Sequence, residues 1–67
     1  MTAEQAKEIA KHYIGELGDY PGTPTLYYVK ASGSFEGGYV WNVPIIHDGK
    51  VVDGIDIDAQ TGEEIGE

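Results

Sequence analysis

The stretch that decides the fold reads Val51-Val-Asp-Gly-Ile-Asp-Ile-Asp-Ala-Gln-Thr-Gly-Glu-Glu-Ile65. Within it, Ile55 and Ile57 alternate with polar residues, as in a strand that buries one face. Asp58 can accept hydrogen bonds from the backbone N–H groups that follow it, and Gly62 can adopt the left-handed conformation that reverses the chain. The stretch therefore predicts a strand that ends in a tight turn, with a short strand returning beside it.

An amphipathic helix is predicted over residues 3 to 17. Thr2 and Gln5 have the spacing of a capping box, and Glu4 places a negative charge in the first turn. Apolar residues then recur at spacings of three and four, namely Ala3, Ala6, Ile9, Ala10, Tyr13, Ile14 and Leu17. Residues 18 to 24 contain two prolines and two glycines and cannot continue a helix. One side of the helix is therefore expected to cover a single core.

Two further strands are predicted at residues 25 to 32 and 39 to 46, and the pair Asp48-Gly49 favours a tight hairpin turn after the second. The sequence thus predicts an α+β fold with one N-terminal helix packed on a three- to four-stranded antiparallel sheet. The sheet is expected to be a meander with a closing C-terminal hairpin. Because Pro44 cannot donate a ladder hydrogen bond, we expect the first strand to pair mainly with residues 39 to 43, leaving the proline nitrogen at an open edge or a bulge.

The alternation of side chains along each strand predicts which residues face the helix. On the two later strands the inward residues are Tyr39, Trp41, Val43, Ile45, Val51, Ile55 and Ile57, together with Asp53. On the first strand we expect the inward set to be Tyr27, Val29 and Ala31, because the other parity includes Lys30.

The opposite face of the sheet is then unusually apolar. Its candidate binding residues are Leu26, Tyr28, Val40, Ile46 and Val52. A large exposed apolar area usually marks an interaction surface. This face is therefore expected to bind a protein partner or a second copy of the chain, unless loops, strand twist or a flanking segment cover it.

Length and charge exclude several classes of protein. The 67 residues suffice for a single domain spanning residues 1 to 67, and the chain contains no cysteine for a disulfide or a thiolate metal site. A formal charge of −8 opposes binding to nucleic acid. This acidity fits solubility or adaptation to salt, or steering toward a basic partner or a cation. No apolar run approaches the roughly 20 residues of a membrane span, so the chain as given is expected to be soluble.

No motif for catalysis or for a cofactor is present, and the chain is predicted not to be an enzyme. The two histidines lack the spacing of a metal site, and no serine lies in a G-x-S-x-G pattern. Residues 56 to 67 have the acid spacing of an EF-hand loop, but Gln60 and Thr61 occupy decisive positions. Calcium binding is therefore not expected, and Asp56 and Asp58 are only weak candidates for a looser cation site.

Three segments resemble the PepSY domain family. They are A-K-E-I-A at residues 6 to 10, Y-V-W-N-V at residues 39 to 43, and I-D-I-D-A-Q-T-G-E at residues 55 to 63. The resemblance covers nearly the whole chain and implies a noncatalytic protein-interaction module, for which peptidase inhibition, a chaperone-like role or self-association is expected. The family is often secreted or membrane-attached, so the compartment stays open. The alternative interpretation is an acidic cation-binding or salt-adapted small protein.

Overall fold

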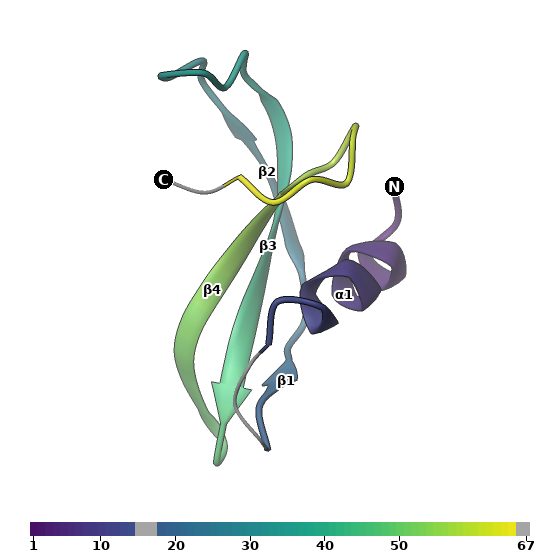
Figure 1. Ribbon diagram of the computed structural model, residues 1–67, viewed down its shortest axis with the longest axis vertical. Coiled ribbons are helices and arrows are strands. Elements are labelled where there is room, and N and C mark those ends of the chain that lie inside the picture. Colours follow the sequence, from purple (N-terminus) through teal and green to yellow (C-terminus); the bar gives the residue numbers. More distant parts are fainter. Residues whose placement is uncertain (15–17, 66–67) are drawn as a thin grey trace.

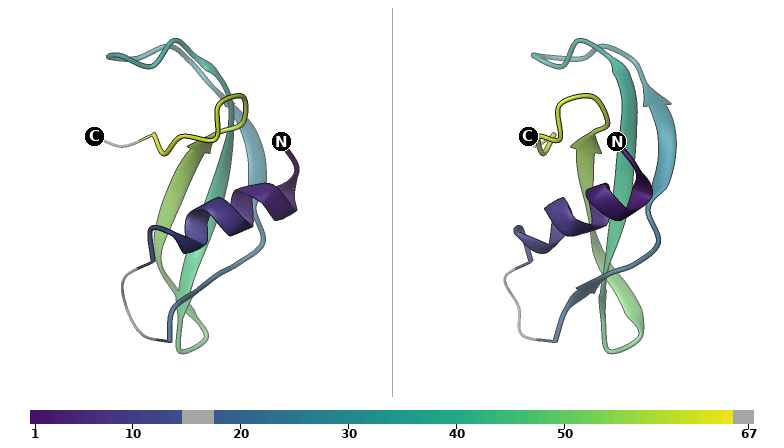
Figure 2. Two further views of the ribbon diagram at one scale, coloured as in Figure 1. Left: turned by 45° about the vertical axis from the view of Figure 1, so that its right-hand side comes forward. Right: turned by 90° about the vertical axis from the view of Figure 1, so that its right-hand side faces the viewer.

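The computed structural model describes residues 1–14 and 18–65. In chain order its elements are α1 (Ala3–Lys11), β1 (Tyr20–Pro21), β2 (Thr25–Val29), β3 (Gly38–His47) and β4 (Lys50–Asp58). The helix lies across one face of a twisted antiparallel sheet, as Figure 1 and the two turned views in Figure 2 show. The predicted α+β fold is confirmed.

β3 is the central strand. β4 pairs with one edge of β3 along residues 40 to 47, so β1 and β2 share the other edge, where Pro21 faces Ile45 and Thr25 faces Asn42. The last described residues return antiparallel to β4, through hydrogen bonds of 2.8 Å from Asp58 N to Glu63 O and from Ile65 N to Asp56 O. This is the predicted closing hairpin.

Pro44 explains why the outer strand is interrupted between β1 and β2. Gly22 N donates to Pro44 O over 2.7 Å. In an antiparallel strand, the backbone nitrogen and carbonyl oxygen of one residue point to the same edge. The proline nitrogen therefore faces the outer strand at the point where residues 23 and 24 leave the ladder. As predicted, the first long strand pairs only beyond Pro44, with Gly38 to Asn42.

The helix begins as predicted but is shorter. Gln5 N donates to Thr2 Oγ1 over 3.2 Å, and Thr2 N donates to Gln5 Oε1 over 2.8 Å, which completes the capping box. Regular helix ends at Lys11, after which the N–H groups of residues 12 to 14 bond to carbonyls three residues earlier. This tightened turn satisfies carbonyls that the helix would otherwise leave free. The predicted end of the helix, at Leu17, lies outside the described residues.

The core lies between α1 and the sheet. Its buried residues are Ala6 and Ala10 from the helix and Val43, Ile45, Ile55 and Ile57 from the two long strands, with Ile9, Ile14 and Trp41 partly buried against them. The two alanines allow the helix to approach the sheet closely. The predicted inward positions of Trp41, Val43 and Ile45 on β3, and of Ile55 and Ile57 on β4, are therefore confirmed.

The predicted inward face of the first strand is wrong. Leu26 faces Trp41 and Tyr28 faces Tyr39, so these two side chains lie on the helix side, whereas Tyr27 faces Val40 on the other side. The prediction depended on Lys30, but β2 ends at Val29, so the charge of Lys30 does not constrain the faces of the strand.

Candidate interaction surface

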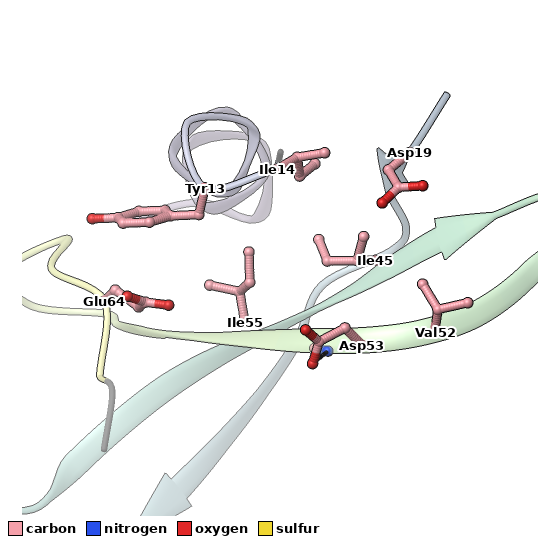
Figure 3. A pocket seen from close by; sticks show the side chains of 9 residues that line it. Tyr13, Ile14, Asp19, Ile45, Val52, Asp53, Ile55 and Glu64 are labelled. Atoms are coloured by element: carbon pink, nitrogen blue, oxygen red, sulfur yellow. Dashed lines mark hydrogen bonds between the residues drawn. The ribbon is translucent and has the colours of Figure 1, made fainter. Parts of the chain in front are cut away.

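The five predicted binding residues do not share one face. Leu26 and Tyr28 lie on the helix side and are 46% and 63% exposed, whereas Val40 lies on the opposite side and is 1% exposed. Ile46 is partly buried and covers Gly22, where an added Cβ would lie 2.7 Å from Ile46 Cδ1. Val52 is the extra residue at the irregularity between β3 and β4, and its side chain points toward the helix side (Figure 3).

Three exposed apolar residues on paired strands instead lie together at one end of the helix side. We call Leu26, Tyr28 and Tyr39 the aromatic patch. The rings of Tyr28 and Tyr39 meet edge to face, with centroids 5.5 Å apart and planes at 81°. Trp41 adjoins the patch across the ladder from Leu26, and its Nε1 donates to Met1 O over 3.2 Å. The patch is thus formed by side chains on paired strands and borders the core.

Tyr39 belongs to the patch although its parity had placed it under the helix. It is 59% exposed. The helix crosses the strands and is about 10 to 12 Å wide with its side chains, whereas a strand of ten residues such as β3 is about 33 Å long. The right-hand view in Figure 2 shows β2 and β3 continuing past the N-terminal end of α1. Side-chain parity gives the face of a residue, but only the length and placement of the helix decide whether it is covered.

The opposite face carries a hydrogen-bond network instead of an apolar surface. Asp56 Oδ1 accepts from Tyr27 Oη over 3.0 Å and from Asn42 Nδ2 over 2.8 Å, which links β2, β3 and β4. Burial raises the pKa of the Tyr27 phenol, and the hydrogen bond and negative charge of Asp56 raise it further. These side chains hold the strands together.

The two aspartates considered for a cation site have structural partners. Asp58 faces Val40 and Asp56 faces Asn42, so both lie on the side of the sheet away from the helix. Asp58 Oδ1 accepts from Gln60 N over 2.8 Å and from Thr61 N over 3.3 Å, within the turn after β4. Within residues 1–14 and 18–65, no group of three potential metal ligands comes together. Nothing specific therefore favours the cation-binding interpretation.

A shallow groove lies between the end of the helix and β4 (Figure 3). Tyr13 and Ile14 line one side and Ile45 and Ile55 the other, with acidic side chains at the rim from Asp19, Asp53 and Glu64. Asp19 already pairs with His47, because its Oδ1 lies 2.5 Å from His47 Nδ1. The groove is negatively charged, and its apolar floor is part of the core.

The described residues thus form a small α+β domain with an exposed aromatic patch. No helix within the described ranges is long and apolar enough to span a membrane. The whole chain, residues 1–67, matches the family model described as "Peptidase propeptide and YPEB domain". The chain therefore belongs to the PepSY family, whose domains are generally noncatalytic modules resembling propeptides or inhibitors. The comparisons with curated proteins and with solved structures returned no significant match.

Proposed function

We propose that this chain is a noncatalytic interaction module that binds a peptidase through the aromatic patch, as an inhibitor or as a chaperone-like aid to folding. The observation that carries the proposal is the exposure of Leu26, Tyr28 and Tyr39 at 46%, 63% and 59%. Exposed apolar patches on small proteins commonly mark interaction sites. The family description as a peptidase propeptide supports a peptidase as the partner.

The patch has the properties of a binding hot spot. Tyrosine and tryptophan are enriched at such sites because they bury a large area at little cost in conformational entropy. Here the tyrosines project from paired strands, and Trp41 beside them is held through the carbonyl of Met1. A partner would therefore meet a surface whose shape is largely set before binding, which lowers the entropic cost of association.

The proposal is tested by adding the domain to a thermolysin-like metallopeptidase and measuring hydrolysis of a peptide substrate, and separately the yield of active peptidase after refolding. We expect the wild-type domain to lower the first or raise the second. Tyr28→Ala should weaken the effect about tenfold, which corresponds to about 1.4 kcal/mol.

The matched control is Tyr13→Ala, because Tyr13 is 49% exposed but lies at the end of the helix, away from the patch. It should act like the wild-type domain. If neither peptidase activity nor refolding yield responds to the domain, or if both variants lose the effect equally, the proposed role of the patch is wrong.

A further inference from the structure

β2 forms an edge of the sheet, and along this edge the described residues provide no pairing strand. Its partner is β3 alone, and four of its five residues are exposed. In Figure 2 the strand lies at the side of the sheet opposite β4. An edge strand of this kind offers backbone N–H and C=O groups to any other extended chain.

The ladder shows which backbone groups point outward. Ala59 N donates to Tyr39 O over 3.1 Å, so the backbone groups of Tyr39 point toward β4. In an antiparallel pair, the residue opposite such a position points its own groups away from the partner strand. Tyr28 lies opposite Tyr39, so its N–H and C=O point to the free edge, as do those of Leu26 two residues earlier.

The edge also lacks the usual protection against pairing. Natural edge strands are commonly blocked by charged side chains, prolines or bulges. Pro21 and Pro24 block β1 and the interruption after it, but β2 (Thr25–Val29) contains no proline and no charged residue. The first charge is Lys30, just beyond the strand.

We infer that β2 pairs with the β2 strand of a second copy of this chain, in antiparallel orientation about a twofold axis. The inference rests on the proposed function, because it makes the patch and its strand an interaction surface. Charge favours a second copy as the occupant. The outer strand, residues 20 to 29, has no charge with which to attract a basic or acidic peptide, whereas seven of the twelve acids follow residue 47. Each chain has a formal charge of −8, and its acids gather toward β4. Pairing through β2 places the two β4 edges on opposite sides of the dimer, far from each other.

The backbone geometry then specifies the register. Within β2 only Leu26 and Tyr28 offer free groups, and the register that pairs all of them places Leu26 of each copy opposite Tyr28 of the other, with the axis beside Tyr27. Residues opposite one another share a face, so both helices lie on the same side of a continuous sheet. Leu26 then packs against Tyr28 of the second copy, and the two aromatic patches become one surface.

This register places one Tyr27 opposite the other in a pair without hydrogen bonds, where Cα atoms lie about 4.5 Å apart, within the range that a disulfide requires. The chain contains no cysteine, so Tyr27→Cys introduces a single thiol at the axis. Mild oxidation at millimolar protein should link this variant into a dimer. Val51→Cys is the control, because Val51 is 67% exposed but lies on β4. Equal linking of both variants would overturn the inference.

A second experiment does not depend on the tyrosine. Light scattering after size exclusion should show the wild-type mass rise toward that of a dimer between micromolar and millimolar concentration. Leu26→Pro removes an outward N–H without removing a bond to β3, so it should fold but raise the dimer dissociation constant at least about tenfold. Circular dichroism confirms that the variant is folded. A wild-type monomer at millimolar concentration, or a dimer unaffected by Leu26→Pro, overturns the inference.

These outcomes separate the inference from the proposed function. If the chain stays monomeric but still acts on the peptidase through Tyr28, the function holds and the second copy is the wrong occupant. Protection of the Tyr28 amide from hydrogen exchange only when peptidase is added would likewise count against the second copy. If the chain dimerises through β2 but has no effect on the peptidase, the inference holds and the proposed peptidase role fails.

Discussion

Replacing Trp41 with alanine tests how the helix covers the sheet. The indole packs partly buried against the core cluster and donates from Nε1 to Met1 O over 3.2 Å. Truncating a fully buried tryptophan to alanine costs about 3 to 5 kcal/mol, and partial exposure lowers the expected cost here to about 2 to 4 kcal/mol. A domain of 67 residues is typically stable by about 3 to 10 kcal/mol. Trp41→Ala should therefore remove a large part of the free energy of unfolding.

The assay is urea unfolding followed by far-ultraviolet circular dichroism, because the variant lacks the only tryptophan. Trp41→Phe is the control. It keeps most of the buried area but loses the hydrogen bond, so it should cost only about 1 kcal/mol. A change below about 0.5 kcal/mol for Trp41→Ala, the size expected for a surface site, would refute the packing described here. So would wild-type tryptophan emission at the wavelength of a fully hydrated indole.

Three further predictions each test one contact or conformation of the structure. Gly62→Val should cost at least about 1 kcal/mol, because Gly62 has a φ of 80° and an added Cβ would lie 3.0 Å from Met1 Cε; an unchanged melting temperature would contradict the turn. Thr2→Ala should cost about 1 kcal/mol through loss of the helix cap, measured by thermal unfolding, whereas a silent change would mean that this end is frayed. The raised pKa of Tyr27 contributes stability that is fully present below the pKa of an unfolded tyrosine, about 10, and is lost as the pH rises through the folded value. When the pH is raised above about 10, the free energy of unfolding measured with urea should therefore fall less for Tyr27→Phe than for the wild type. In an NMR titration, Asp56→Asn should lower the pKa of Tyr27.

Local chemistry determined much of the fold from the sequence alone. The capping box at Thr2 and the left-handed turn at Gly62 depend on groups within a few residues of one another, so a sequence pattern is enough to predict them. The inward positions of Trp41 and Val43, and of Ile57 on the next strand, follow from strand alternation once a helix covers that side.

Only the tertiary structure decided where the candidate site lies. β1 and β2 pair with β3 in registers that differ by one residue, because the chain leaves the ladder near Pro24. A shift of one residue exchanges the two faces of a strand. The faces of Leu26 and Tyr28 could therefore not be inferred from the alternation on β3. The exposure of Tyr39 depended on a helix that crosses only part of the strand, and the Asp56 network on residues brought together from three strands. Local rules fix how a segment folds, but the register and extent of packing between segments fix which of its side chains remain available for binding.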